Sequence, residues 1–498
     1  GAGVAVQQRR PREGWRRLSW MADGGVVVMK PGNAGRAKAP CCSADTQSRK
    51  SPGIGASLAT PPDSVRTLQS VLQAKAKSEA AYRFYSLWDK VCRADVLYEA
   101  WRRCRRNRGT AGVDGQTFRD IEELGLETWL QRLRQELRTG QYRSKPLLRV
   151  WIPKASGGQR PLGIPTIRDR VVQMAMLLIL GPIFEEDMFR WQYGFREGVD
   201  AKMALRRIHF GIADRGAREV VDADLSDYFN TIPHGHLMRC VARRGADGTI
   251  LTMLRQWLDA PVVERAADGG EIRTTVARDT NRGTPQGGVI SPLLANLYFR
   301  RFMLAWYGGG HAQRLRAEVV NYADDFVILC QQGTGKEAMA TMRRLMSKLG
   351  LRVNEKKTRL VRLSDERFDF LGYTVGRFYG RHGRPYWGTA PSRKSLKRLR
   401  KRIHDETTSR WFGLPVSKRI EELNPILRGW ANYFDQGPVS RAYRDIDTYT
   451  ARRLRTWLRR RSGKRGTGYR QYPDQYLYEK LGLIRLVPIP RNRSNAKV

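Results

Sequence analysis

The sequence predicts an α+β protein in which a sheet with split βαβ connections lies between N-terminal helices and C-terminal basic helices. Three observations predict this class. A helical hydrophobic period runs through residues 64–101, β-branched strands meet aspartates in residues 219–224 and 319–330, and the chain beyond about residue 388 turns to long basic helices. The strands and helices around the aspartates follow the order of a split βαβ unit.

The composition bounds the size of the protein and the class of its partners. The 498 residues are enough for about three domains. Lys and Arg total 91 against 48 Asp and Glu, and the resulting net charge of +43 favours a polyanionic partner. Phosphate backbones fit best, with strongly salt-dependent binding, and an anionic membrane surface is the weaker alternative.

The apolar runs and the cysteines exclude other classes. The longest apolar run, residues 171–184, contains Gln173 and is too short to span a bilayer, so we expect a buried helix and no membrane partner. The first sixty residues lack the apolar core of a secretion signal. Six scattered cysteines offer neither a zinc cluster nor a disulfide framework, which fits a reducing cytoplasm.

The N-terminal part divides into a segment without periodicity and a helical region. Residues 1–65 are rich in Gly, Ala, Arg, Ser and Pro, which predicts disorder, and Met21 and Met29 are both candidates for the native start. The helical period that follows ends in a basic run at residues 102–106. The glycine-rich loop 107–115 suits close approach to a nucleic-acid backbone, and equally suits a plain connection between helices.

A β-hairpin with two cations follows. Residues 149–154 and 160–165 predict its strands, and residues 155–159 its turn. Lys154 and Arg160 flank the turn, so both can face one ligand. Two such cations suit a triphosphate, although either residue alone is typical of solvated surface charge.

Three aspartates carry the chemistry. A strand runs into Asp224, and a hydrophobic hairpin places Asp324 and Asp325 at its tip. Adjacent carboxylates repel one another and lose hydration there, whereas Mg²⁺ prefers such hard oxygen ligands and reverses the cost. We therefore expect a two-metal site for phosphoryl or nucleotidyl transfer if the strands are sheet neighbours. An ordinary polar turn is the alternative.

Neighbouring polar residues have simpler interpretations. Asp222 and Asp227 are typical capping or surface residues, and His234 and His236, which follow Pro233, indicate a helix start rather than a metal site.

The loop 282–292 leads into a predicted helix at residues 293–304, and its N–H groups beside Gln286 can hold a nucleotide or a template strand. A helix at 336–349, a strand within 351–358 and a short strand at 368–373 complete the order.

The C-terminal region is basic. Residues 451–498 hold 14 Lys or Arg against two acids. A charge run alone is usually a solvated face, but here aromatic residues are interleaved, which predicts nucleic-acid binding. These aromatic residues are Trp457, Tyr469, Tyr472, Tyr476 and Tyr478.

Taken together, the motifs resemble those of a bacterial group II intron-encoded reverse transcriptase/maturase, and they fall in the order of that family. The matching segments are residues 107–118, 152–165, 193–196, 222–230, 284–288, 322–325, 370–372 and 423–434. They resemble, in turn, an N-terminal template motif, the fingers hairpin and its following motif, the first catalytic motif, the Pro-Gln-Gly loop, Tyr-Ala-Asp-Asp, the primer grip and the maturase signature.

The resemblance implies a right-hand polymerase with fingers and a split βαβ palm, followed by an α-helical thumb/maturase domain and a basic DNA-binding segment. The expected domains are the disordered N-terminal segment (1–65), the N-terminal extension and fingers (66–200), the palm (201–384), the thumb/maturase domain (385–450) and the DNA-binding tail (451–498). The zinc-supported endonuclease of many relatives has no counterpart in this sequence, so we expect no target-strand nicking and a primer from elsewhere.

The resemblance also implies residue roles. Asp224, Asp324 and Asp325 would hold two Mg²⁺ (or Mn²⁺ as a substitute), assisted by the carbonyl of Leu225. The nucleotide-binding residues would be Lys154, Arg160, Tyr228, Gln286 and Lys357. Tyr228 is assigned the place under the incoming sugar, where it excludes a 2′-hydroxyl; the family usually has Phe there.

The implied function is RNA-directed DNA synthesis together with binding of group II intron RNA, to promote splicing and mobility by target-primed reverse transcription. Its partners would be intron RNA, target DNA and dNTPs in the bacterial cytoplasm at the nucleoid, and the oligomeric state stays open. The alternatives are a host-adopted reverse transcriptase in repair or defence, which would have no intron partner, and a non-enzymatic RNA-folding splicing cofactor, against which the three carboxylates argue.

Overall fold

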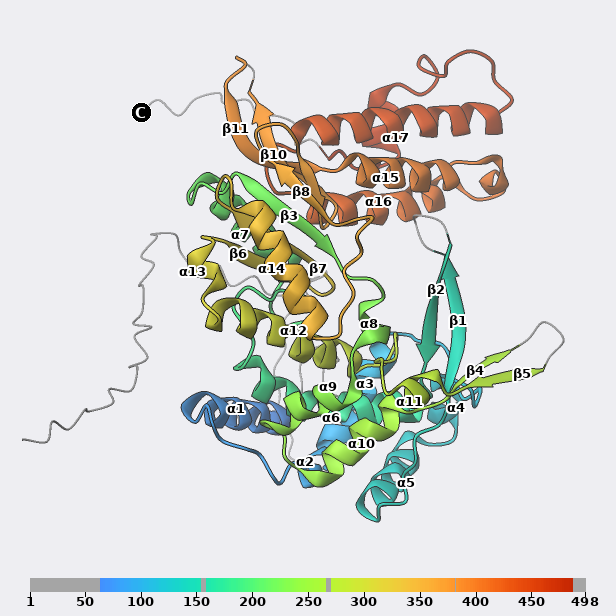
Figure 1. Cartoon of the computed structure of the whole chain (residues 1–498). Coiled ribbons are helices and arrows are strands. Elements are labelled where there is room, and N and C mark those ends of the chain that lie inside the picture. Colours follow the sequence, from blue (N-terminus) through green and yellow to red (C-terminus); the bar gives the residue numbers. More distant parts are fainter. Residues whose placement is uncertain (1–62, 154–157, 266–269, 381, 487–498) are drawn as a thin grey trace, which may run out of the picture. The chain divides into compact units, whose positions relative to one another are not determined.

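A computed structural model describes residues 63–153, 158–265, 270–380 and 382–486 (Figure 1). The segment expected to be disordered therefore lies almost wholly outside the described residues, as does Lys154. The first helix begins at Asp63, so the boundary expected at residue 65 falls inside a helix.

The N-terminal helices surround a buried one. They are α1 (Asp63–Ser78), α2 (Trp88–Val91), α3 (Ala94–Arg106), α4 (Phe118–Glu123), α5 (Leu126–Arg138) and α6 (Ile167–Glu185). Helix α6 starts at the cap residue Thr166, whose side chain accepts a hydrogen bond from the Asp169 N–H, and most of its side chains are buried. The buried helix predicted from residues 171–184 is thus confirmed, and no helix in the described part of the chain has the length and apolarity to cross a membrane.

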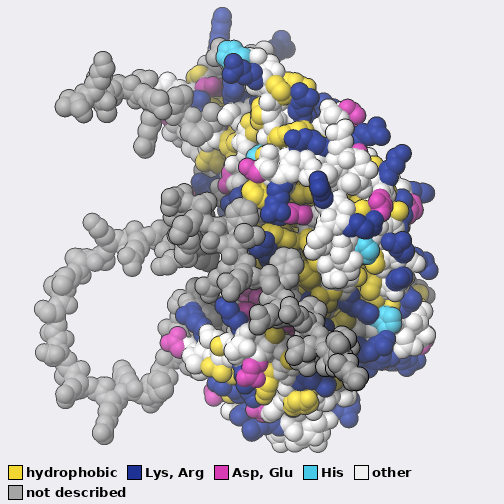
Figure 2. All heavy atoms as spheres, turned by 60° about the vertical axis from the view of Figure 1, so that its left-hand side comes forward, with side chains coloured by type: hydrophobic (Ala, Val, Ile, Leu, Met, Phe, Trp, Pro, Cys, Tyr) yellow, Lys and Arg dark blue, Asp and Glu magenta, His cyan; other side chains and the backbone are white. Residues whose placement is uncertain are grey.

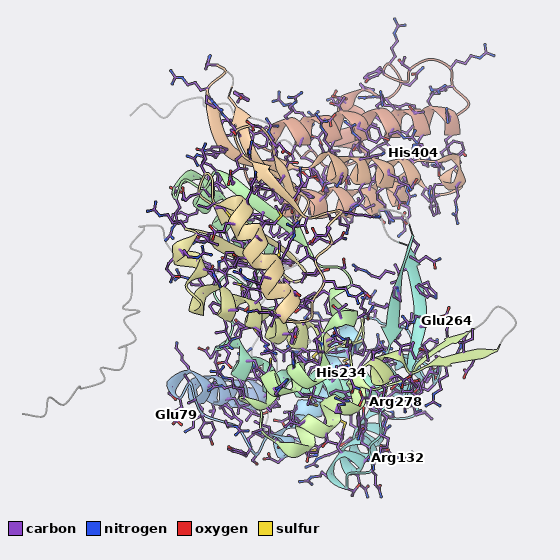
Figure 3. All side chains as sticks on the ribbon, viewed as in Figure 1. Glu79, Arg132, His234, Glu264, Arg278 and His404 are labelled. Atoms are coloured by element: carbon purple, nitrogen blue, oxygen red, sulfur yellow. The ribbon has the colours of Figure 1, made fainter. Side chains whose placement is uncertain are left out.

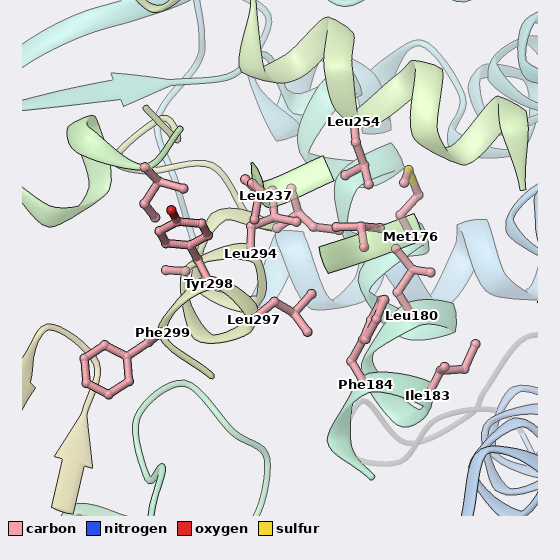
Figure 4. Packing of buried hydrophobic residues seen from close by; sticks show 14 of the residues in the cluster. Met176, Leu180, Ile183, Phe184, Leu237, Leu254, Leu294, Leu297, Tyr298 and Phe299 are labelled. Carbon is pink, nitrogen blue, oxygen red and sulfur yellow. The ribbon is translucent and has the colours of Figure 1, made fainter. Parts of the chain in front are cut away.

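The largest core forms around α6. Figure 4 shows Met176, Leu180 and Phe184 of α6 in the same cluster as Leu254 and Leu294 from later helices. The later helices of this part of the chain are α9 (His234–Ala242), α10 (Gly248–Leu258) and α12 (Ser291–Gly308). Three short helices lie before, between and after them in the sequence: α8 (Tyr228–Thr231), α11 (Val276–Thr280) and α13 (His311–Arg314).

The first sheet has the order β2-β1-β4-β5. Its strands are β1 (Leu147–Pro153), β2 (Gln159–Ile164), β4 (Val262–Arg265) and β5 (Glu271–Thr274). The predicted β1–β2 hairpin is confirmed. Strand β4 pairs in parallel with β1, so β4 and β5, which lie within the expected palm range, belong to the same sheet as the predicted hairpin. The β1–β4 pairing joins segments more than a hundred residues apart, so no local sequence pattern predicts it.

The central sheet has the order β6-β7-β3-β8, with antiparallel neighbours. Its strands are β3 (Glu219–Asp224), β6 (Glu318–Tyr322), β7 (Asp325–Cys330) and β8 (Arg359–Arg362), and the helices α7 (Ala201–Ala213) and α14 (Gly335–Lys348) pack against it. This is the predicted split βαβ arrangement. The strand expected within residues 351–358 begins later, at Arg359, because residues 352–358 form a loop against the end of β3.

A third sheet, in the order β11-β10-β9, leads into the C-terminal helices. Its strands are β9 (Phe368–Phe370), β10 (Tyr373–Tyr379) and β11 (Pro385–Pro391), and the main helices that follow are α15 (Arg393–Asp405), α16 (Val416–Tyr433) and α17 (Ser440–Arg461). A 3₁₀ turn (Ser409–Trp411) and a π-helical turn (Tyr476–Lys480) complete the region.

Two expected boundaries need correction here. Residue 384 lies between the paired strands β10 and β11, and residue 450 lies inside α17, which runs without a break to Arg461. Leu454 and Leu458 of α17 share a core with Leu399 of α15 and Leu423 of α16. The helical unit therefore begins at α15 and includes the first part of the expected tail, and the predicted α+β class is confirmed.

Candidate active site

The central sheet brings the predicted carboxylates together. Asp224 ends β3 and lies directly opposite Asp325, the first residue of β7, and Asp324 precedes it in the β6–β7 turn. Directly opposed residues of antiparallel strands have Cβ atoms about 5 Å apart, and like charges there are destabilising. The three carboxylates thus bring like charges together at one end of the sheet.

Contacts from buried residues support the turn that contains Asp324. Ala323 has a positive φ of 59°, and the fully buried Asn321 donates from Nδ2 to the Ala323 carbonyl at 2.7 Å. A Cβ on Gly194 would lie 2.2 Å from the Ala323 nitrogen, so only glycine permits this approach. Asn296 in turn donates to the Gly194 carbonyl at 2.7 Å. Sequence reasoning assigned none of these supporting roles, since the contacts join distant segments.

The loop 352–358 supplies the partners of Asp224. Asn354 donates from Nδ2 to the Asp224 carboxylate at 2.9 Å, and the Lys357 ammonium lies 3.2 Å from the same group. The Asp224 N–H reaches the Thr358 hydroxyl at 3.3 Å. Lys357, predicted to bind nucleotide, therefore contacts one of the predicted catalytic carboxylates in this structure. Leu225 follows Asp224 and bridges to Val353 of the same loop.

The electrostatics of the cluster favour a cation. Desolvation by the surrounding protein, and then the charges of Asp324 and Asp224, raise the pKa of Asp325 to about 6. Burial also raises the pKa of Asp222, although Arg359 at 3.5 Å partly offsets this. The donor set, hard carboxylate oxygens in excess of nearby cations, fits Mg²⁺. No three His, Cys, Asp or Glu side chains in the described ranges form a preformed metal cluster, so the carboxylates would have to turn toward a shared ion.

The raised pKa predicts a stability effect of Asp325→Asn. Because the folded-state pKa of about 6 exceeds the ordinary 3.8, the ionised carboxylate costs stability above pH 6, and this cost fades as the pH falls toward about 4. In metal-free buffer at pH 7.5, Asp325→Asn should raise the melting temperature by roughly one to two degrees, a modest value because the carboxyl is exposed. Thermal melts of both proteins from pH 4 to pH 7.5 measure the gain, and a gain that persists at pH 4 would contradict it.

The structure corrects the assignment of Tyr228. Its side chain is only 3% exposed, and its hydroxyl donates to the Ala295 carbonyl at 2.7 Å, so it belongs to the core. The next residue, Phe229, is half-buried. Its carbonyl accepts from the Thr284 N–H at 2.7 Å, and its ring lies 6.2 Å from that of Phe195. Phe229 thus lies between the Pro-Gln-Gly loop and the segment beneath the Asp turn, and it is the candidate for the sugar contact.

The loop with Gln286 joins the β1–β2 hairpin to this site. Gln286 lies with its side-chain nitrogen 3.4 Å from the Asp227 carboxylate, and its carbonyl accepts from the Gly163 N–H at 2.7 Å. A Cβ on Gly287 would meet the Gly163 carbonyl at 2.6 Å. Arg160 is exposed on β2, which these contacts fasten to the loop.

Other basic residues near the site have structural partners. Arg196, left without a role in the sequence, pairs with Glu185 and donates to the Gln192 carbonyl at 2.5 Å. Arg170 donates to the Thr110 carbonyl and, at 3.0 Å, to the Pro165 carbonyl. The glycine-rich loop 107–115 is thereby joined to the end of the β1–β2 hairpin.

His234 and His236 behave as predicted from their position after Pro233. Helix α9 begins at His234 (Figure 3), which is fully buried. Its Nε2 lies 2.7 Å from the Gly283 carbonyl. Burial lowers the pKa of His234. The residue therefore fastens α9 to the loop before Thr284.

The aromatic residues of the basic C-terminal region divide into two groups. Trp457 is fully buried and donates from Nε1 to the Thr408 carbonyl at 3.2 Å, so it cannot contact nucleic acid as its basic surroundings predicted. Tyr469 is exposed, and the Arg455 guanidinium lies 4.1 Å from its ring. Tyr472, Tyr476 and Tyr478 are partly exposed.

Comparisons with known proteins agree with this arrangement. Residues 152–375 match the family "Reverse transcriptase (RNA-dependent DNA polymerase)", and residues 396–475 match "Group II intron, maturase-specific domain". The chain is 34% identical to Protein YkfC of Escherichia coli (strain K12), over 64% of this chain and 90% of that protein.

Intron proteins are also similar to this chain. The group II intron-encoded protein LtrA of Lactococcus lactis subsp. cremoris is 31% identical over 43% of this chain and 34% of LtrA. An uncharacterized 91 kDa protein in the cob intron of Schizosaccharomyces pombe is 24% identical over 70% of this chain and 50% of its own length. The chain thus spans half or less of these two intron proteins. It belongs to the group II intron type of reverse transcriptase with a maturase-specific domain, an RNA-directed DNA polymerase of the right-hand fold.

Proposed function

We propose that the protein copies RNA into DNA at the Asp224, Asp324 and Asp325 cluster and also binds its parent group II intron RNA to assist splicing and mobility. The observation that carries the first part is the in-register pairing of Asp224 with Asp325 beside Asp324. The maturase-specific match at residues 396–475 and the similarity to LtrA support the second part.

The three carboxylates would hold two Mg²⁺, for which Mn²⁺ could substitute, with the Leu225 carbonyl as a further ligand. Bound Mg²⁺ would supply activation of the primer 3′-hydroxyl and neutralisation of the triphosphate. Lys357 would leave Asp224 as that carboxylate turns to the metal, and its ammonium would then contact the triphosphate. Removing this ion pair costs little, because Lys357 is largely exposed and water replaces the contact.

Other residues would position the substrate. Arg160 on β2 would bind the triphosphate together with Lys154, which lies outside the described residues. Gln286 would brace the nucleotide or the template, since its loop is hydrogen-bonded both to β2 and to the backbone of Phe229. Phe229 would contact the sugar in place of Tyr228.

We assign the parts of the hand accordingly: fingers from the N-terminal helices and the β2-β1-β4-β5 sheet, palm from the β6-β7-β3-β8 sheet, and thumb/maturase domain from α15 onward. Lys and Arg side chains cover much of the face in Figure 2, with fewer Asp and Glu side chains between them. Such a surface suits intron RNA and target DNA through their phosphates, which would place the protein at the bacterial nucleoid.

A splicing assay tests the second activity separately from polymerisation. We expect the protein to accelerate self-splicing of its parent intron RNA at near-physiological salt. The Asp324→Ala/Asp325→Ala variant should retain this effect fully, because RNA binding through the basic surface needs no carboxylate. Without acceleration by the wild type, and with DNA synthesis intact, the intron part of the proposal would fail and a reverse transcriptase acting elsewhere would remain.

A further inference from the structure

The outer end of the β10–β11 hairpin displays aromatic rings to solvent. Tyr379 is 60% exposed and Tyr386 is 38% exposed. At the other end of the hairpin, Tyr373 and Val375 are buried in the core that also holds Phe434. Within the described residues, Phe378, Tyr379 and Tyr386 belong to no hydrophobic cluster, so packing does not account for them.

Two glycines leave room for the neighbouring side chains over one face of the hairpin. Gly376 and Gly388 face one another in register. A Cβ on Gly376 would lie 2.8 Å from the Cγ of Arg367, and a Cβ on Gly388 would lie 2.9 Å from the Tyr386 ring. Glycine weakens a strand interior and often marks a site where another group approaches the backbone closely. The two glycines therefore lower the stability of the strands but leave space above the sheet.

An arginine–aromatic row occupies that space. The Arg367 guanidinium lies 4.2 Å from the Phe378 ring centre and donates from Nε to the Arg377 carbonyl at 2.8 Å. The rings of Phe378 and Tyr386 stack with centres 6.1 Å apart and planes 28° from parallel. On the opposite face of the hairpin, Arg377 lies 5.7 Å from the Tyr379 ring. Both faces therefore combine aromatic surface with a guanidinium.

The charge of the hairpin selects the class of partner. Residues 373–391 contain three arginines and no Asp or Glu. The tip is closed by hydrogen bonds from the Gly380 N–H to the Arg384 carbonyl, at 2.8 Å, and from the Gly383 N–H to the Gly380 carbonyl. These hydrogen bonds join the two strands next to Tyr379 and Tyr386. A partner with planar apolar faces and regularly spaced negative charge complements this aromatic and basic surface, and unpaired nucleotides have both properties.

We propose that the outer end of the β10–β11 hairpin (Arg367, Arg377, Phe378, Tyr379, Arg384 and Tyr386) binds unpaired nucleotides of an RNA or DNA strand. Bases stack on the exposed rings of Tyr379 and Tyr386, Phe378 supports Tyr386 from beside it, and the arginines contact phosphates. Duplex does not bind there, because its bases are already stacked. This site is distinct from the carboxylate cluster and does not depend on the splicing activity.

The test measures binding of a fluorescent 12-nucleotide single strand to the full-length protein after its polymerase site has been filled with an unlabelled primer–template duplex. Tyr379→Ala/Tyr386→Ala should weaken binding at least about tenfold, as loss of base stacking predicts. Tyr82→Ala/Tyr85→Ala is the matched control, because it also removes two exposed tyrosines, 40% and 64% exposed, and it should bind as the wild type does. RNA and DNA strands of one sequence are compared to assign the preferred strand.

The Tyr379→Phe/Tyr386→Phe variant separates stacking from other effects. It should restore wild-type affinity, because Phe keeps the π-face and loses only the hydroxyl. The proposal is overturned if the double Ala variant binds within about twofold of the wild type, a difference of under 0.5 kcal/mol. It is equally overturned if the Phe variant is as weak as the Ala variant, or if a duplex of the same sequence competes as well as the single strand.

Discussion

Replacing Asp324 and Asp325 together with Ala should reduce RNA-templated DNA synthesis by about a thousandfold or more, since two-metal chemistry supplies several kcal/mol of transition-state stabilisation. Asp325 lies opposite Asp224 in the sheet and Asp324 is its neighbour, so the variant keeps Asp224 alone of the three predicted metal ligands. The measurement is primer extension on an RNA template with dNTPs and Mg²⁺.

A matched control distinguishes loss of chemistry from loss of negative charge. Asp365 and Glu366 form another exposed acidic pair close to β8, and Glu366 is ion-paired with Arg359 at 3.0 Å. Asp365→Ala/Glu366→Ala should keep most of the extension activity. Extension by Asp324→Ala/Asp325→Ala within about tenfold of the wild type would contradict the assigned site, because a factor of ten corresponds to only 1.4 kcal/mol. Unfolding does not account for such a loss, since removing like charges from the cluster relieves repulsion.

The sequence predicted those parts of the fold and site whose signals are local. Strand β3 ends at Asp224 as its β-branched run indicated, and the hairpin around Asp324 and Asp325 has the predicted strands. The period-2 pattern and the turn residues lie within a few positions of each other, so they need no tertiary information. The sequence left open whether the strand ending at Asp224 neighbours this hairpin. The split βαβ order of the elements favoured it, and the structure pairs β3 with β7.

Contacts between segments that are distant in the sequence could not be predicted from it. Asn321 and Gly194 support the Asp turn, and nothing local marks either as a partner of Ala323. Lys357 is paired with Asp224 through a loop where a strand was expected. Trp457 follows a run of basic residues, yet its ring fills the core between α17 and Thr408. In each case tertiary packing decides the environment, and periodicity does not encode it.

Tyr228 and Phe229 show the same limit at the level of one residue. Both are aromatic, and the sequence alone does not say which of them turns inward. In the structure, Asp227 has a left-handed φ of 52° and caps the short helix α8. With the helix starting there, the Tyr228 side chain points into the core. The neighbour, Phe229, is then left at the surface of the site.

Phe229→Val should therefore relax sugar selection and raise ribonucleotide incorporation relative to deoxynucleotides by about 10- to 100-fold, the range that loss of a steric contact in a pocket produces. The physical reason is space: the half-buried ring between the Pro-Gln-Gly loop and Phe195 would occupy the volume that a 2′-hydroxyl needs. Single-nucleotide incorporation with each rNTP and its dNTP, as ratios of kcat/KM, measures the effect.

Tyr228→Phe is the matched control for this prediction. It removes the hydroxyl that donates to the Ala295 carbonyl but keeps the ring in the core, so it should cost about 1 kcal/mol of stability and leave sugar selection unchanged. If Tyr228→Phe changed the ratio and Phe229→Val did not, the contact would belong to Tyr228, and the buried ring would have to leave the core when nucleotide binds. Because that ring is 3% exposed and packs against Phe299, its release would open a cavity beside the catalytic strands, at a cost of a few kcal/mol. Sugar selection by Phe229 requires no such rearrangement.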